Sequence, residues 1–388
     1  MGCMAQRLGK KLIEKFPAVD YVMGTMSRSL FPQILENIEN NIKSRLKNQN
    51  NDLNVSADFE PNPVNFTDVN ELEFVFSKSH HEEGKFRTFI PIMHGCNNFC
   101  SYCIVPYVRG REVSRDPAHI SEEIKIAGEK GVREITLLGQ NVNSYLWQEN
   151  SNTVNFSGLL SMVVKEVKKS KIKWIRFLSA NPKDFSRETI QVIAENPAIC
   201  RHIHLCVQHG SNKILKAMNR QYTRETYLEL ISEIRHAIPE ISFSTDIIVG
   251  FPGETDEDLE ETLSLMEEVQ FLYSYMYHYN PIEGTAAYSF PNRIEDNIKK
   301  ERLSRIIALQ KKHTKQLLKD RIGKKELVLI EGISRKNADE LISRTTRDEM
   351  AVTPGTADLI GSFAWIIPLE LRGNTFYAKE YVPEFRFF

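Results

Sequence analysis

Six short β-rich runs, separated by amphipathic stretches of helical length, constrain the fold of this 388-residue chain more than any other feature. This alternation predicts a parallel sheet with crossover helices, and therefore an α/β fold. Six units fit a partial (β/α)6 barrel better than a closed eight-stranded one. In such a sheet, functional groups lie just beyond the carboxyl ends of the strands. The six runs are 86–93, 133–141, 173–180, 202–208, 241–250 and 271–280.

The regions on either side of this core have a different character. Residues 1–35 predict a short helix and a strand-like run, which together form an α/β end piece too small to fold alone. The next stretch, 36–80, is rich in Asn, Glu and Lys and predicts a linker after one helix. After a long helical stretch at 295–322, several closely spaced strand-like runs predict a small antiparallel β-barrel.

The overall charge does not by itself indicate a polyanionic partner. The 50 Lys and Arg residues face 51 Asp and Glu residues, so any such partner must bind a local basic patch. No window approaches the roughly 18 consecutive apolar residues of a membrane span, and the first residues do not resemble a secretory signal. We therefore expect a cytoplasmic protein without a membrane partner.

Three of the six cysteines stand close together in CNNFCSYC, directly after the first predicted strand. The thiolates of Cys96, Cys100 and Cys103 can bind three irons of a cubic 4Fe-4S cluster and leave the fourth iron open. A structural zinc site is the alternative, with His94 as its fourth ligand, but such sites usually have a two-plus-two spacing of Cys and His. The spacing of three thiolates on one loop favours the iron-sulfur cluster.

The spacing CxxxCxxC, with Tyr102 before the last cysteine, resembles the cluster loop of the radical S-adenosylmethionine (SAM) enzymes. Longer segments resemble the MiaB-type tRNA methylthiotransferases across nearly the whole chain. The resemblance implies a radical-SAM core at 81–316 and, at 319–383, a TRAM barrel, which is an RNA-binding module. The resembling segments are GCNNFCSYCIVPYVRGREVSR, LLGQNVNSY, HLCVQHGSNKILKAMNRQYTR and STDIIVGFPGETDEDLEET.

The resemblance also implies a reaction on N6-isopentenyladenosine next to the anticodon of tRNA. The cluster held by Cys96, Cys100 and Cys103 cleaves SAM to a 5′-deoxyadenosyl radical, which takes hydrogen from C2 of the adenine, and a methylthio group replaces it. A second SAM donates the methyl group, and a flavodoxin- or ferredoxin-like protein supplies the electron to a monomeric enzyme. Related enzymes act on threonylcarbamoyladenosine in tRNA or on an aspartate of a ribosomal protein, but GQNVNSY resembles the isopentenyladenosine enzymes.

Several polar residues at the strand ends are candidates for binding SAM or substrate, whereas no catalytic residue is assigned. An ordinary strand-to-helix turn also accounts for the residues after the second strand. Asp246 lies in an apolar run, where burial of an unpaired carboxylate is costly, so it pairs with a cation or has a polar role near SAM. Ser211 and Gln208 bind ribose or cap the following helix. The candidates for binding the cofactor are Tyr102, Gly139, Gln140, Asn141, Gln208 and Asp246.

Two basic segments are candidates for contact with the tRNA backbone, although an exposed run of charge also serves as a solvated face. The first is RGREVSR, with Arg109, Arg111 and Arg115. The second begins in the long helical stretch and continues into the predicted barrel. Its members are Lys311, Lys312, Lys315, Lys319, Arg321, Lys324, Lys325, Arg335, Lys336, Arg344 and Arg347.

The first residues, GCMAQR, resemble the segment that carries the third of three cysteines for a second 4Fe-4S cluster in the family. Only Cys3 is present, so residues 1–35 are expected to be the remnant of a methylthiotransferase domain, from a truncated or misassigned start. The alternative function is a catalytically incomplete RNA-binding iron-sulfur protein. Cys200 and Cys206 are expected to be structural, although Cys206 stands where relatives commonly have proline.

Overall fold

The computed structural model describes residues 1–16, 18–19, 21–25, 27, 30–49, 64–66 and 84–383. The chain divides into two compact units, and the chain passes between them at the cysteine loop. The first unit comprises Met1–Ser77, His94–Asn97 and Cys103–Val113, and the second comprises Lys78–Met93, Asn98–Tyr102 and Ser114–Phe388.

The first unit contains short helices and one pair of strands. The helix predicted near the start is divided by Gly9, whose φ of 47° suits a residue without a side chain, into α1 (Cys3–Leu8) and α2 (Lys10–Lys15). Strand β1 (Tyr21–Met23) pairs in parallel with β2 (Val64–Phe66). Helix α3 (Phe31–Gln49) overlaps the start of the linker predicted at 36–80, and β2 lies within it. The rest of that linker lies outside the described residues. Helix α4 (Val105–Arg109) completes the unit.

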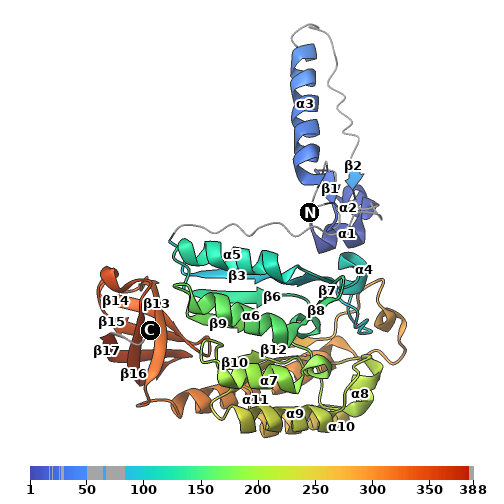
Figure 1. Ribbon diagram of the computed structural model, residues 1–388. Coiled ribbons are helices and arrows are strands. Elements are labelled where there is room, and N and C mark those ends of the chain that lie inside the picture. Colours follow the sequence, from blue (N-terminus) through green and yellow to red (C-terminus); the bar gives the residue numbers. More distant parts are fainter. Residues whose placement is uncertain are drawn as a thin grey trace. The chain divides into compact units, whose positions relative to one another are not determined.

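The second unit contains six parallel strands in two three-stranded sheets, and they coincide with the six runs predicted from the sequence (Figure 1). An isolated parallel bridge between Ala180 and Leu205 joins the sheets. The carboxyl ends of the strands therefore lie at one edge, as the alternation predicts. In order, the strands are β3 (Arg87–Pro91), β6 (Glu134–Leu138), β9 (Trp174–Phe177), β10 (His202–His204), β11 (Ser242–Val249) and β12 (Tyr273–His278).

Helices follow these strands, and most of them pack against their neighbours in chain order. Several of their N-termini are defined by side chains that accept a backbone N–H, among them Asn155, Ser186, Thr223 and Thr255. Apolar side chains of the helices and the strands form one large buried core. The helices are α5 (Pro117–Glu129), α6 (Phe156–Lys168), α7 (Arg187–Glu195), α8 (Asn212–Ala217), α9 (Arg224–Ala237), α10 (Asp256–Val269) and α11 (Asp296–Lys319).

The C-terminal part of the second unit is a closed five-stranded barrel in the order β13-β14-β15-β17-β16 (Figure 1). The sequence predicts an antiparallel barrel, but β15 and β17 pair in parallel through Ala351 and Phe376. An odd number of strands cannot alternate in direction around a closed ring, so one neighbouring pair must be parallel. The strands are β13 (Glu326–Ile333), β14 (Glu340–Thr345), β15 (Met350–Pro354), β16 (Phe363–Arg372) and β17 (Thr375–Pro383).

The remaining strands are short. The hairpin of β7 (Leu146–Glu149) and β8 (Asn152–Asn155) lies between the second parallel strand and α6. The two-residue strands β4 (Met93–His94) and β5 (Val113–Ser114) flank the cysteine loop in the sequence. Within the described residues, no helix is both long and apolar enough to span a membrane.

Candidate iron-sulfur and cofactor site

The part of the cysteine loop that belongs to the second unit is fixed by hydrogen bonds to the end of α8. Ser101 donates its backbone N–H to Met218 O at 3.0 Å and its hydroxyl to Ala217 O at 2.8 Å. Asn219 Nδ2 donates to Phe99 O at 3.0 Å. Phe99 has a positive φ of 47°, which is uncommon for a residue with a side chain, so these contacts hold the loop in a strained conformation.

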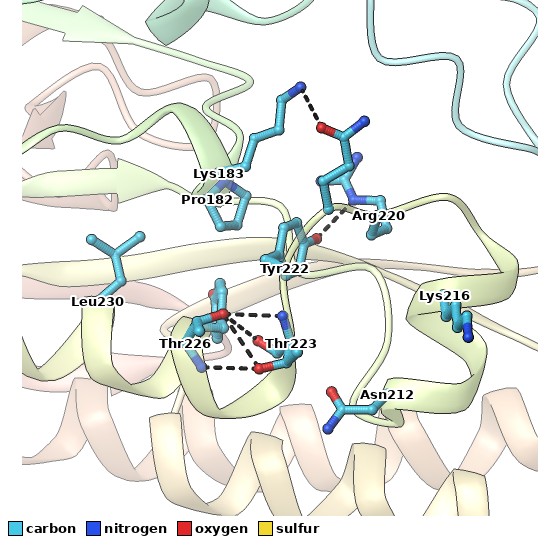
Figure 2. Close-up of a pocket in the computed structure, with 11 residues that line it drawn as sticks. Pro182, Lys183, Asn212, Lys216, Arg220, Tyr222, Thr223, Thr226 and Leu230 are labelled. Atoms are coloured by element: carbon cyan, nitrogen blue, oxygen red, sulfur yellow. Dashed lines mark hydrogen bonds between the residues drawn. The ribbon is translucent and has the colours of Figure 1, made fainter.

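Arg220 binds the sulfur of Cys100 within the second unit. Its NH1 group donates to Cys100 Sγ at 3.2 Å and its NH2 group to Cys206 O at 3.0 Å. The side chain is itself held by Tyr222, since Nε donates to Tyr222 Oη at 2.8 Å (Figure 2). Burial would lower the pKa of Arg220, but Tyr222, Tyr102 and Cys100 raise it well above its ordinary value. A fixed cation beside this sulfur fits a cysteine that binds iron as a thiolate.

Cys96 and Cys103 belong to the first unit, together with Cys3. The backbone N–H of Cys96 donates to Gly110 O at 3.2 Å, which fixes the start of the loop. Cys3 Sγ accepts a hydrogen bond from Arg109 Nε at 3.2 Å. Arg109, a candidate for phosphate contact, therefore has a partner inside its own unit.

Tyr102 packs into a small apolar cluster of the second unit. The cluster contains Ile214 and Met218 from the region of α8, together with Phe251 and Tyr279, which follow β11 and β12. Tyr102 thus lies at the carboxyl edge of the sheet, where a cofactor is expected. Its role in binding SAM stays a prediction.

The three candidates after β6 have different environments. A Cβ atom added to Gly139 would lie 2.4 Å from Met93 Cγ, so a side chain does not fit without displacing Met93. Asn141 Nδ2 donates to Asp184 Oδ2 at 2.7 Å. Among the described residues, the buried acceptors Gln140 Oε1 and Asn141 Oδ1 have no hydrogen-bond partner. An unpaired buried acceptor costs about 1–3 kcal/mol, so the two oxygens fit an external donor such as the ammonium group of SAM.

The inner face of the second sheet carries polar and aromatic side chains. The register places His204, Ser244 and Tyr273 side by side, and Asp246 beside Tyr275. Because side chains alternate along a strand, Tyr277 shares the face of Tyr275 and Tyr273. Tyr275 and Tyr277 are 51% and 55% exposed, so two aromatic rings remain accessible on this face.

Asp246 and Gln208 meet at the carboxyl edge. Gln208 N donates to Asp246 O at 2.9 Å, and Gln208 adopts a positive φ of 71°. Burial would raise the pKa of Asp246, but contacts with His204, Cys206 and Gln208 lower it below its ordinary value. Asp246 is therefore an ionised, partly buried carboxylate. Among the described residues, it does not form the salt bridge with a lysine or arginine that the sequence left open, and its nearest titratable partner is His204, 3.5 Å away.

Ser211 lies at the N-cap position of α8 but does not cap the helix with its side chain. Its hydroxyl donates to Asp258 Oδ1 at 2.6 Å instead. The capping role expected for Ser211 is therefore wrong, because a buried carboxylate is a stronger acceptor for the hydroxyl.

Two arginines assigned to tRNA contact are not available for it. Arg115 is 4% exposed, lies 2.6 Å from the carboxylate of Glu123 and donates to Pro91 O. Arg321 is buried between Glu326 and Glu349. The assignment of both to the tRNA backbone is wrong, because each guanidinium already neutralises a buried carboxylate.

Exposed lysines of the second basic segment line a groove beside α11. The groove has a volume of about 750 Å³ and lies between α11, β12 and the hairpin that joins β16 to β17. Lys311, Lys315 and Lys319 form its basic wall. The other lining residues include Tyr273, Ser274, Met276, Gln310, Thr314, Ile322, Leu369, Leu371 and Asn374.

The parallel strands and the cysteine loop define a radical-SAM protein, and residues 90–266 match the Radical SAM superfamily. Curated relatives named tRNA-2-methylthio-N(6)-dimethylallyladenosine synthase include a protein of Treponema pallidum (strain Nichols), 48% identical over 97% of this chain and 82% of its own length. Another, from Treponema denticola, is 46% identical over 98% of this chain and 83% of its own length. The chain belongs to the tRNA-2-methylthio-N(6)-dimethylallyladenosine synthase family.

Solved structures are more distant. Coproporphyrinogen III oxidase (HemN) from Escherichia coli, a radical SAM enzyme, is 14% identical, with a TM-score of 0.44 over 73% of this chain and 67% of its own.

The sequence interpretation did not single out Arg220, Tyr275 or Tyr277. Arg220 lies in MNRQYTR, a segment used only for its resemblance, and no local signal shows that its side chain reaches Cys100. The tyrosines of β12 alternate at period two, which is typical of one face of a strand, and this pattern could have indicated the inner face.

Proposed function

We propose that this protein adds a methylthio group to C2 of N6-isopentenyladenosine beside the anticodon of tRNA. The observation that carries the proposal is the 48% identity over 97% of the chain to a relative whose name states this activity. The cysteine loop and the unpaired acceptors after β6 support it independently, since they suit an iron-sulfur cluster and SAM. The protein acts in the cytoplasm as a monomer that receives electrons from a flavodoxin- or ferredoxin-like donor.

The fold is a partial (β/α)6 barrel at 81–316, followed by a TRAM domain at 319–383. Cys96, Cys100 and Cys103 hold the 4Fe-4S cluster, which, when bound together with SAM, supplies the electron for reductive cleavage of SAM. The protein's own contribution is to bind and orient SAM and the tRNA base and to exclude water from the site. Gln140 Oε1 and Asn141 Oδ1 accept from the SAM ammonium group, and their burial makes that interaction strong.

The exposed rings of Tyr275 and Tyr277 form the platform for the adenine base. Base stacking on an aromatic side chain is worth about 1–3 kcal/mol, and the tyrosines are the large exposed apolar side chains of β12. Tyr275 also makes an edge contact with His204, at 5.6 Å between ring centroids, which restricts its rotation. The inner face thus orients a flipped-out base above the sheet.

A second 4Fe-4S cluster is implied for the family, and Cys3 is its candidate ligand in this chain. Of the six cysteines, three belong to the cluster loop, while Cys200 and Cys206 are buried in the second unit. For the second cluster, a polypeptide of residues 1–388 therefore offers Cys3 alone, whereas a cluster normally requires three or four thiolates. We expect this polypeptide to bind about four irons rather than eight.

The activity is tested with the reconstituted protein, SAM, dithionite, inorganic sulfide as the sulfur source, and two tRNAs that carry isopentenyladenosine or threonylcarbamoyladenosine. We expect 2-methylthio product from the first tRNA only, measured by mass spectrometry of the nucleosides. Product from the second tRNA alone would transfer the assignment to the threonylcarbamoyladenosine enzymes. Formation of 5′-deoxyadenosine without any methylthio product would favour the alternative of an iron-sulfur protein that lacks sulfur insertion.

The groove beside α11 is the proposed contact for the tRNA backbone. Lys311, Lys315 and Lys319 present three charges on one wall, because positions four apart lie on one face of a helix. The exposed Lys312, Lys324 and Lys325 extend the positive surface, whereas Arg321 is internal. Arg111, Arg335 and Lys336 stay candidates, while Arg344 and Arg347 are engaged with Glu331, Asp348 and Glu326.

Replacing Lys311, Lys315 and Lys319 together by Gln should weaken tRNA binding and make its dependence on salt shallower. Each phosphate contact contributes roughly 0.7–0.9 to the slope of log K against log salt, so the slope should fall by about 2–3. The control carries the same number of substitutions at exposed Lys165, Lys168 and Lys171 around the end of α6. An equal loss of slope in the control, or none in the groove variant, would show that the groove is a solvated face. Fluorescence anisotropy across a salt series provides the measurement.

A further inference from the structure

Three side chains of different ligand type converge on the inner face of β10 and β11. His204, Cys206 and Asp246 each offer one ligand atom, and these atoms lie within 4.8 Å of one another. His204 Nε2 is 3.3 Å from Cys206 Sγ and 3.5 Å from Asp246 Oδ2. A tetrahedral ion with bonds of about 2.0–2.3 Å separates its ligands by about 3.3–3.8 Å, so the spacing suits one small cation.

The hydrogen bonds behind His204 fix which ring nitrogen carries the proton. Ser242 donates its hydroxyl proton to Arg201 O, so Ser242 Oγ must accept from His202 Nδ1, 2.8 Å away. His202 is buried and, among the described residues, forms no ion pair with a carboxylate, so its ring carries one proton and its Nε2 accepts from Ser244 at 2.8 Å. Ser244 Oγ, having donated, accepts from His204 Nδ1 at 3.0 Å.

In this chain of hydrogen bonds, His204 donates from Nδ1, so Nε2 is the ring nitrogen that faces Cys206 and Asp246 and is available to a metal ion. The single S–H proton of Cys206 can satisfy one of the two facing acceptors, Nε2 or the carboxylate, but not both. The remaining lone pairs repel unless a positive charge lies between them. The orientation of His204 by a hydrogen bond at its other nitrogen is the arrangement found around metal-binding histidines.

We propose that His204 Nε2, Cys206 Sγ and Asp246 Oδ2 bind a divalent transition metal, with Zn²⁺ as the ion that suits the mixed nitrogen, sulfur and oxygen set. Cys206 loses its proton when the metal binds. The thiolate and the carboxylate then balance the two charges of the ion, which removes the cost of burying a net charge. The side chain of Asp246 keeps 28% of its surface exposed, so water completes the tetrahedron from that side.

The site is separate from the three cysteines of the cluster loop but is connected to them. Arg220 donates to Cys206 O and to Cys100 Sγ, and so joins the two sets of ligands within the second unit. A metal at this position fixes Asp246 beside the proposed base platform at Tyr275.

The first experiment uses Co²⁺ as the probe in the full chain with Cys96, Cys100 and Cys103 replaced by Ala, so that the cluster loop offers no thiolate. We expect one Co²⁺ per chain with a thiolate-to-cobalt charge-transfer band. Adding Cys206→Ala should remove the band, whereas adding Cys200→Ala, at the other buried cysteine, should leave it intact. Circular dichroism confirms the fold of each variant.

Graded variants separate a metal site from a protonated His204–Asp246 pair. Asp246→Asn keeps the shape but removes a charged ligand, and it should weaken Co²⁺ binding more than Ser244→Ala. The latter removes the hydroxyl that orients His204 and also contacts His202, but no ligand atom, and it should cost about 10–100-fold in affinity. In the cluster-loaded wild type, we expect about one tightly held Zn²⁺ by elemental analysis, and none in Cys206→Ala.

Absence of a sulfur-bound Co²⁺, or binding unaffected by Cys206→Ala, would overturn the proposal. These readouts involve neither tRNA nor SAM, so they are independent of the methylthiolation assay.

Discussion

Replacing any one of Cys96, Cys100 and Cys103 by Ala is expected to abolish cleavage of SAM to 5′-deoxyadenosine and, with it, methylthiolation. In the proposed function, three thiolates on one loop hold the cluster, and a site that loses one of them has a second iron without a ligand. The loss should be complete within the sensitivity of the assay, because the reduced cluster is the source of the electron. Chromatographic detection of 5′-deoxyadenosine after anaerobic reduction measures it.

Two comparisons make this prediction specific. Cys200→Ala changes a buried cysteine that packs against Trp174 and Leu329, so it should retain cleavage and about four irons per chain. Cys3→Ala should also retain SAM cleavage and about four irons per chain, because Cys3 alone cannot assemble a second cluster. Cleavage that persists in the Cys96/Cys100/Cys103 triple variant would exclude these residues as the cluster ligands, and about eight irons in the wild type would contradict the single-cluster expectation.

The positions of all six parallel strands could be predicted from the sequence, because each is a short β-rich run bounded by turn residues. The run at 241–250 became β11, Ser242–Val249, and the other five agree to within a few residues. The cysteine loop could be placed at the carboxyl end of the first strand for the same reason. Strand direction follows from the crossover helices, which force parallel pairing.

The partners of charged side chains could not be predicted in this way. Arg115 and Arg321 occur in segments that look like exposed basic runs, yet their carboxylate partners are Glu123, on the next helix, and Glu349, in the turn before β15. Arg220 reaches Cys100 across 120 residues of sequence. Such contacts depend on the tertiary fold and cannot be predicted from the local sequence pattern. The same limit applies to His204, Cys206 and Asp246, which meet only because β10 and β11 are neighbours.

The second large effect is expected at Arg220, whose cation contacts Cys100 Sγ without being a ligand. Reduction adds a negative charge to the cluster, and a nearby positive charge stabilises the reduced form. Replacing Arg220 by Met should therefore make the midpoint potential more negative and slow SAM cleavage on the order of 100-fold, which is the usual effect of removing one preorganised donor. Arg220→Lys keeps the charge but cannot contact both Cys100 and Cys206. The midpoint potential of this variant should therefore lie between those of the wild type and Arg220→Met.

A structural role alone would not produce this order of potentials. Arg224, two residues after Tyr222, donates to Glu261 O and Ser264 Oγ on α10, so Arg224→Met removes a guanidinium nearby without removing the contact to Cys100. Its potential should match that of the wild type. Redox titration followed by electron paramagnetic resonance measures the potential on protein with a full iron content, and therefore separates electronic tuning from loss of the cluster. An unchanged potential in Arg220→Met, with iron retained, would show that Arg220 only supports the loop.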